Sequence, residues 1–339
     1  MKKNLACILI IFIVPVCVLP AFSFAVSQVK VGANPWAVAV DSTTNKIYVT
    51  NSGNDSVSVI DGKTNTVIKN IIVGENPTGI GVNQATDMVY VSKFSSPTVS
   101  VIDGNTGFVT GTIIVGSQPN GIGIDEIANK AYVANTNSAS VSVIDCKTNT
   151  VTDTIPVGAR PTAVAVNPVR GMAYVTNSGA GTVSIIDEKT DTVTKTIPVG
   201  NGTTGVAVDP VDDTIYLTSS KTSEVFAIDG DTGFVTHTIA VGANPDGITV
   251  DPVQDKIYVA DSGGGTVSVI DGKTDTVSGT IPAGTHVYGI AVNPSTGLVY
   301  AGNDSPGLVY VISDKEIPQT SNAIFEGLVQ FFSHLFGMS

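Results

Sequence analysis

Residues 32–73 read GANPWAVAVDSTTNKIYVTNSGNDSVSVIDGKTNTVIKNIIV, and this unit of 42 residues is repeated in tandem through most of the chain. No insertion or deletion changes the spacing between the copies. A fixed period in the forties with several short strands is typical of the blades of a β-propeller and not of a helical solenoid. The glycine that opens the unit recurs as Gly32, Gly74, Gly116, Gly158, Gly200, Gly242 and Gly284, and its tyrosine recurs as Tyr48, Tyr90, Tyr132, Tyr174, Tyr216, Tyr258 and Tyr300.

Each repeat contains four short strand patterns, which in the first copy are Ala37–Val40, Lys46–Asn51, Ser56–Asp61 and Thr66–Val73. The small residues of the first pattern suit the crowded strand nearest a ring axis. The second and third patterns are apolar on both faces, as expected for a sheet that is buried between two neighbouring sheets. The fourth is polar and takes proline in other copies, which only edge strands tolerate. We therefore expect each blade to run from axis to rim in sequence order.

The number of strands predicts how the ring closes. The copies supply seven first, second and third strands but only six fourth strands after Gly32. Phe24–Val31 aligns with Thr66–Val73 one period earlier, and we expect it to pair with Gly307–Ile312 so that no edge stays open. The prediction is an all-β fold, a single seven-bladed β-propeller of four-stranded antiparallel blades over residues 26–314, closed by the N-terminal strand pairing into the last blade.

One short motif, which recurs in several copies, is similar to the motif of a known family of repeat proteins. YVTN stands at Tyr48–Asn51 and Tyr174–Asn177, with YVAN at Tyr132–Asn135 and YVAD at Tyr258–Asp261. Together with the VGxxPxGIAV and VIDxxTxTV segments, the chain resembles the YVTN family of β-propeller repeat proteins over about residues 26–313. That family includes archaeal surface-layer proteins and bacterial exported proteins, and it has no common catalytic motif. The resemblance therefore implies the fold and an exported role, and no particular reaction.

Residues 1–25 are predicted to be a secretory signal peptide that precedes the propeller. MKKN forms a positive region and LACILIIFIVPVCVLP an apolar one, and Ser23 and Ala25 occupy the −3 and −1 positions of a cleavage site. An uncleaved N-terminal anchor is the alternative, and the interruptions at Pro15 and Pro20 favour cleavage. We expect an exported protein located in the extracellular space, at the cell surface or in the periplasm.

Charge and cysteine content narrow the classes of partner and chemistry. The formal net charge of −12 repels phosphate backbones, so we expect no nucleic-acid partner. Two of the three cysteines lie in the signal peptide, which leaves Cys146 without a partner for an internal disulfide. Cys146 occupies a position that is glycine in four other copies, so we predict an exposed turn residue with no catalytic role.

Recurring acidic and amide residues mark turns in the predicted fold. An Asp or Asn ends the first strand of every copy, and an Asp ends the third strand of six copies. Because both positions lie in turns, capping of the local backbone explains them better than metal binding. The three histidines are on separate segments, so we predict no metal site, no cofactor and no catalytic residue. The first-strand residues are Asp41, Asn83, Asp125, Asn167, Asp209, Asp251 and Asn293.

The loops of one face carry the departures from the repeat. In a propeller the blade-to-blade loops and the loops between second and third strands share a face, which we call the top face, and ligands often bind there. Blades 6, 7 and 1 are neighbours in the ring, so an aromatic pair, a carboxylate and an imidazole are expected to lie close together. They suit a sugar or peptide ligand through stacking and polar contacts. Divergence of exposed loops near the closure is the alternative. The predicted binding residues are Trp36, Asp246, His286 and Tyr288, with Lys93 and Phe94 from blade 2.

Residues 315–339 form a tail after the last repeat. Apolar residues recur at helical spacing within 322–338, which predicts an amphipathic helix that is too short and too polar to span a bilayer well. Three roles stay open: docking on the propeller, contact with a partner, and peripheral contact with a membrane. The polar side of this helix lacks the Lys and Arg of a strong interfacial helix, which favours the first two. The contact residues would include Ile324, Phe325, Leu328, Phe332 and Leu335.

These patterns predict a non-enzymatic function. We expect an exported β-propeller that acts as a cell-surface or surface-layer scaffold, or as a binding scaffold for protein or glycan ligands on the top face. The alternative is a propeller enzyme of lyase or lactonase type with a top-face pocket around His286. No nucleophile elbow, phosphate-binding loop or haem motif is present in the sequence.

Overall fold

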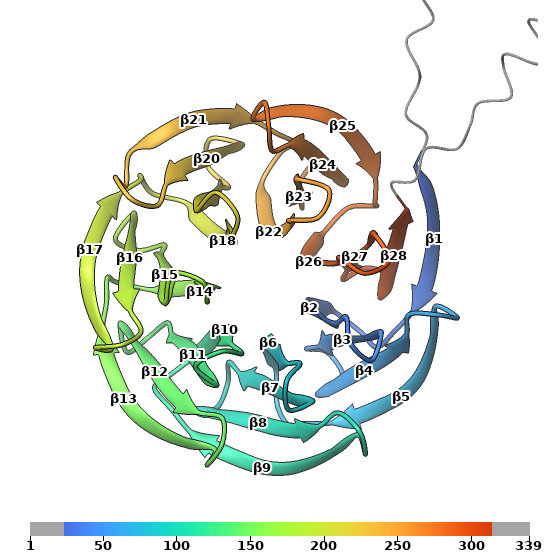
Figure 1. The fold of residues 1–339 in the computed structure, drawn as a ribbon. Helices are drawn as coiled ribbons and strands as arrows, with labels where there is room; N and C mark the ends of the chain where they lie inside the picture. The colour runs from blue at the N-terminus through green and yellow to red at the C-terminus, as the bar shows by residue number, and fades with distance from the viewer. Residues whose placement is uncertain (1–23, 314–339) are drawn as a thin grey trace, which may run out of the picture. The chain divides into compact units, whose positions relative to one another are not determined.

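A computed structural model describes residues 24–313, which fold into twenty-eight β-strands without any helix. The strands form seven antiparallel sheets of four strands each, and the sheets stand around a common axis as the blades of a propeller (Figure 1). The predicted signal peptide up to residue 23 and the predicted tail helix lie outside the described residues. No helix within residues 24–313 is long and apolar enough to cross a membrane.

Within each blade the strands run from the axis to the rim in chain order, as predicted. The inner strands are β2 (Pro35–Asp41), β6 (Pro77–Asn83), β10 (Pro119–Asp125), β14 (Pro161–Asn167), β18 (Thr203–Asp209), β22 (Pro245–Asp251) and β26 (Val287–Asn293). The second strands are β3 (Lys46–Asn51), β7 (Met88–Lys93), β11 (Lys130–Asn135), β15 (Met172–Asn177), β19 (Thr214–Ser219), β23 (Lys256–Asp261) and β27 (Leu298–Asn303).

The outer half of each blade contains the remaining two strands. The third strands are β4 (Ser56–Asp61), β8 (Thr98–Asp103), β12 (Ser140–Asp145), β16 (Thr182–Asp187), β20 (Glu224–Asp229), β24 (Thr266–Asp271) and β28 (Leu308–Ser313). The outer strands are β5 (Thr66–Ile72), β9 (Phe108–Ile114), β13 (Thr150–Pro156), β17 (Thr192–Pro198), β21 (Val235–Ala240), β25 (Thr276–Pro282) and β1 (Ala25–Lys30).

The strand β1 closes the ring, which confirms the predicted closure. It pairs antiparallel with β28 from Ala25 opposite Ser313 to Lys30 opposite Leu308, and Val29 is buried. The six other outer strands all have a shift of register against their third strand, whereas β1 pairs without one. The first and last described strands therefore belong to the same blade.

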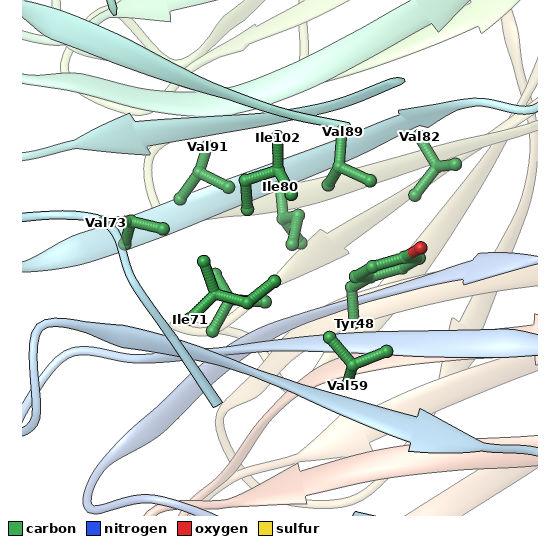
Figure 2. Close-up of a cluster of buried hydrophobic side chains, with 10 residues drawn as sticks. Tyr48, Val59, Ile71, Val73, Ile80, Val82, Val89, Val91 and Ile102 are labelled. Atoms are coloured by element: carbon green, nitrogen blue, oxygen red, sulfur yellow. The ribbon is translucent and has the colours of Figure 1, made fainter. Parts of the chain in front are cut away.

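The hydrophobic core lies between blades rather than within any of them. One cluster joins Tyr48 and Val59 of blade 1 to Ile80, Val89 and other residues of blade 2 (Figure 2). In β3, three successive residues including Tyr48 are at most 1% exposed, so both faces of the strand are covered. A sheet buried on both sides needs apolar residues at consecutive positions, which explains the continuous runs in the sequence.

The tyrosine of the repeat links neighbouring blades through its hydroxyl. Tyr90 donates to Asn149 Oδ1 over 2.8 Å, and Tyr216 donates to Asp275 Oδ1 over 3.1 Å. Both acceptors lie in the turn before the outer strand of the next blade, where the backbone is left-handed. Because the rings are buried, each hydroxyl needs such a partner.

The asparagine that ends YVTN is a structural residue. Asn51 is fully buried, and its Nδ2 donates to Ser58 Oγ over 2.9 Å on the third strand of the same blade. Asn135 and Asn177 make the equivalent bonds to Ser142 and Ser184. The motif therefore fixes how the second and third strands pair.

The prediction that Cys146 is exposed is wrong. Its side chain is 4% exposed and belongs to the core cluster that contains Tyr90. In four other blades glycine stands here, and a Cβ added to it would approach an Asn or Asp side chain of the preceding turn to between 2.0 and 2.3 Å. The cluster includes Tyr90, Val99 and Val101 of the preceding blade, so Cys146 lies at a junction between blades, which sequence spacing alone did not reveal.

Candidate binding site at the axial cavity

A β-bulge near the top end of every inner strand shapes the site. In blade 1 the pairing of β2 with β3 shifts between Pro35 and Val38, and the six other blades show the equivalent shift. Thr50 Oγ1 accepts a bond from Ala37 N over 2.9 Å and donates to Thr78 O of the next blade over 2.8 Å. A bulge re-aims the side chains of the bulged residues, here Trp36 and its equivalents.

The bulged residues surround a cavity of about 280 Å³, which we call the axial cavity because all seven inner strands line it. Glycine or alanine follows each bulged residue, and at Gly247 a Cβ would come within 2.2 Å of Tyr288 O. These small residues let the inner strands approach one another closely. The side chains that line the cavity are Trp36, Ala37, Asn120, Thr162, Ala163, Thr204, Asp246 and Tyr288.

An aromatic pair stands at the rim of the axial cavity. Trp36 and Tyr288 come from neighbouring blades, and their rings stack with centroids 4.7 Å apart at an interplanar angle of 19°. Trp36 is 37% exposed, so one side of the pair stays open to a ligand. The predicted closeness of these two residues is thus observed.

Asp246 lines the same cavity beside Tyr288. Its pKa is raised to about 6, because burial disfavours the charged carboxylate, and a hydrogen bond with Thr204 only partly offsets this. Asp246 and Asp304 also raise the pKa of Tyr288, after the larger effect of its burial. The cavity therefore contains one carboxylate close to an aromatic pair.

His286 lies next to the aromatic pair but is not among the described residues that line the cavity. Its ring centroid is 6.5 Å from that of Tyr288, and its Nδ1 is 3.9 Å from Asp304 Oδ1. His286 adopts a left-handed backbone with φ 65° and its side chain is 56% exposed. It could contact a ligand that extends outward from the cavity.

Lys93 and Phe94 lie apart from the four other predicted residues. Lys93 ends β7, a second strand, and its stem lies over Gly74, with the Cδ 3.2 Å from where a Cβ of residue 74 would be. Burial lowers the pKa of the Lys93 ammonium. Phe94 N donates to Asn76 O in the loop that opens blade 2. Neither is among the residues that line the axial cavity in the described part of the chain.

Among the lining residues that were not predicted, three carry polar side chains. Asn120, Thr162 and Thr204 occupy the repeat position of Trp36, as do Asp246 and Tyr288. Comparing that single position across the seven copies would have found them. Asn120, Thr162 and Thr204 are ordinary polar residues of the repeat, so none of them departs visibly from the pattern of the loops.

A larger groove of about 830 Å³ lies where blade 7 meets blade 1, between β1 and β5. Lys30, Asn70, Ile72 and Asp304 are among the residues that line it, and none of its described lining residues is aromatic. In residues 24–313 no group of three or more His, Cys, Asp or Glu side chains is arranged to hold a metal ion. The axial cavity is therefore the better candidate for stacking a ligand.

The comparisons with known proteins support the fold. No family model matches the chain, and no curated protein matches it by sequence. Among solved structures it is similar to a chain described as Kuenenia stuttgartiensis hydrazine synthase, with a TM-score of 0.76 and 20% identity. The match covers 84% of this chain and 97% of the other. At this level of identity the similarity concerns the fold alone.

Proposed function

We propose that this protein is an exported, non-enzymatic β-propeller of the YVTN type that acts as a binding scaffold at the cell surface or in a surface layer. Its ligand is a protein or a glycan that binds on the top face at the axial cavity. The observation that carries this proposal is the stacked pair of Trp36 and Tyr288 on a cavity that also contains Asp246. Aromatic side chains with a few convergent polar groups are typical of binding pockets.

Binding of the purified protein to peptide and glycan arrays tests this function. Trp36→Ala and Tyr288→Ala should abolish binding, whereas Phe234→Ala should not, because Phe234 is an exposed aromatic residue of blade 5 outside the cavity. If no array component binds, or if both cavity variants bind like the unchanged protein, the proposed function is rejected.

The competing function is an enzyme of lyase or lactonase type built around His286. A specific turnover of lactones or uronate polymers that His286→Ala abolishes would establish the enzyme and refute the scaffold. We expect no such turnover, because His286 lies outside the lining of the cavity and its Nδ1 is 3.9 Å from Asp304 Oδ1, beyond hydrogen-bonding distance.

A further inference from the structure

The charge at the axial cavity breaks the pattern of the repeat. The position of Trp36 is occupied in the other blades by Thr78, Asn120, Thr162, Thr204, Asp246 and Tyr288. Only Asp246 is an acid at this position, and no lysine or arginine is among the described residues that line the cavity. A single carboxylate thus stands in a ring of otherwise uncharged groups.

Within the described residues, Asp246 takes part in no ion pair. The neighbouring hydroxyl of Thr204, on the adjacent inner strand, is uncharged and donates to Pro245 O over 3.3 Å. A half-buried carboxylate without a counter-charge carries a desolvation cost that a cation at the same place would offset. The unmatched charge points to a cationic group on the ligand.

The aromatic neighbours favour the same kind of ligand. Trp36 and Tyr288 cover one face of each other, and the open faces can attract a cation through their π-electrons. Asp304 lies close enough to raise the pKa of Tyr288, so a second carboxylate lies near the aromatic pair, with the imidazole of His286 3.9 Å from it. A neutral sugar would gain from stacking but would leave the carboxylate without a counter-charge.

We propose that the axial cavity binds a protonated primary amine, the side chain of a lysine that a protein ligand presents to the top face. This inference rests on the proposed binding function and narrows its ligand class. Asp246 accepts hydrogen bonds from the ammonium, and Trp36 and Tyr288 contact the ammonium and the aliphatic stem. A cavity of about 280 Å³ is at the small end for ligand pockets and suits one inserted side chain.

The fluorescence of Trp36 measures this binding directly, because Trp36 is the only tryptophan in the chain. The titrants are a lysine-containing peptide, the same peptide acetylated at the lysine Nζ, Nα-acetyl-lysine methylamide with a free side-chain amine, and a neutral oligosaccharide. We expect saturable changes with the free lysine peptide and none with its acetylated form. The methylamide separates recognition of the side chain alone from recognition of a longer peptide.

Asp246→Asn should weaken binding of the lysine peptide by at least about tenfold, because a partly desolvated ion pair is lost. Asp153→Asn is the matched control, since Asp153 is an exposed acid on the outer strand β13. Equal binding of the acetylated and free peptides would overturn the inference, whether or not Asp246→Asn folds. Binding of the neutral oligosaccharide alone would overturn it too but would leave the scaffold function standing.

Discussion

At the scale of single residues, Tyr48 departs from its equivalents. Its buried hydroxyl has no hydrogen-bond partner among the described residues, whereas Tyr90, Tyr132 and Tyr216 each bond a turn residue of the next blade. The turn residue that would serve Tyr48 is Gly107, which has a left-handed backbone with φ 65°. A buried hydroxyl without a partner lowers stability.

Gly107→Asn should therefore stabilise the protein by about 1 kcal/mol, through the new bond and reduced freedom of the unfolded chain. Asparagine tolerates this backbone, and the new Cβ would meet the flexible end of Lys69. Chemical denaturation measures the gain. In the background of Tyr48→Phe the substitution should lose most of its effect, and an equal gain there would show that the hydroxyl is not involved.

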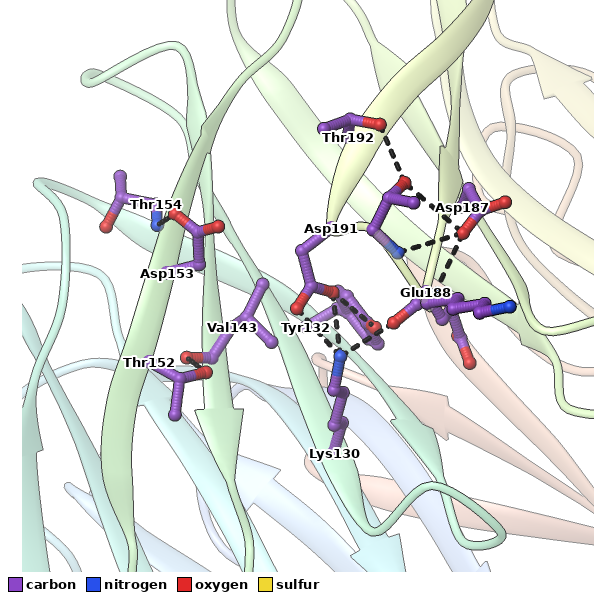
Figure 3. Close-up of polar contacts among 12 residues, drawn as sticks. Lys130, Tyr132, Val143, Thr152, Asp153, Thr154, Asp187, Glu188, Asp191 and Thr192 are labelled. Atoms are coloured by element: carbon purple, nitrogen blue, oxygen red, sulfur yellow. Dashed lines mark hydrogen bonds and ion pairs between the residues drawn. The ribbon is translucent and has the colours of Figure 1, made fainter.

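Glu188 is another exception to the repeat. It stands where four other blades have glycine. In those blades an Asn or Asp of the preceding turn lies against this position, whereas in blade 4 the turn residue is Gly171, where an added Cβ would meet nothing within 4 Å. Its buried carboxyl lies near Asp125. Lys130 donates to the Glu188 carbonyl and to the Asp191 carboxylate (Figure 3). Burial, and then Asp125, raise the pKa of Glu188 to about 9.

The stability of the protein should accordingly depend on pH through Glu188. The pKa of Glu188 is about 9 in the folded protein and 4.5 ordinarily, so the folded state binds this proton more tightly than the unfolded state does. The contribution of the protonated side chain to the free energy of unfolding is therefore complete below pH 4.5 and is lost as the pH rises through 9. Glu188→Gln should remove this loss and stabilise the protein by about 2 kcal/mol at pH 8. Melting temperatures from pH 4 to 9 check it, with Glu75→Gln as an exposed control; parallel curves for Glu188→Gln and the unchanged protein would contradict the assignment.

At the scale of elements, the ends of the inner strands connect the blades at the face opposite the loops of the binding site. Asn83 donates to Asn129 over 2.7 Å, and Asn167 donates to Asp213 over 2.7 Å. The capping role predicted for the Asp or Asn that ends each inner strand is also confirmed, because Asp41 Oδ1 accepts hydrogen bonds from the backbone amides of Thr43 and Thr44. Asn167 does both, because its Oδ1 also accepts a bond from Val169 N in its own turn over 3.2 Å.

The small residues of the inner strands set how closely the inner strands of neighbouring blades approach one another. At Gly79 an added Cβ would lie 2.0 Å from Asn120 O, a backbone atom of the neighbouring blade. Gly79→Ala should therefore destabilise the protein by about 2 kcal/mol, since the two strands must move apart. Ala37→Gly, at the equivalent position of blade 1, should cost about 1 kcal/mol or less. Thermal unfolding measures the stability of both variants. Equal losses would contradict the close approach of the two inner strands at Gly79.

The sequence predicted the second and third strands of blade 1 with the observed bounds, because alternation, tyrosine and turn residues mark them clearly. It began the inner strand at Ala37 instead of Pro35, since the bulge hides the pairing of the first residues. Trp36 and Tyr288 were predicted to be close because the ring makes blades 7 and 1 neighbours. The burial of Cys146 and Glu188 depends on contacts across a blade boundary, which one repeat does not contain.

At the scale of the whole molecule, the strand β1 holds the ring together. Val29 is buried in the core shared with blade 1, while its neighbour Gln28 is exposed on the same strand. Val29→Asp should destabilise the protein by about 3 kcal/mol or more, because a carboxylate would be buried without a partner. Gln28→Asp should change the melting temperature little. Similar losses in both variants would show that charge on β1, not loss of packing, is responsible.

The pairing of Ala25 with Ser313 places the two ends of the described chain opposite each other on adjacent strands. A tight turn like the one from Asp61 to Thr66 could join them, and the chain could then be opened elsewhere. Circular permutants opened between a third and an outer strand, for example after Glu188, would again close one blade with strands from both ends. Permutants opened after Gly200 would lack that shared blade and should melt at a lower temperature. The blade at which the chain starts would then be interchangeable, and the shared blade would set the stability of the ring.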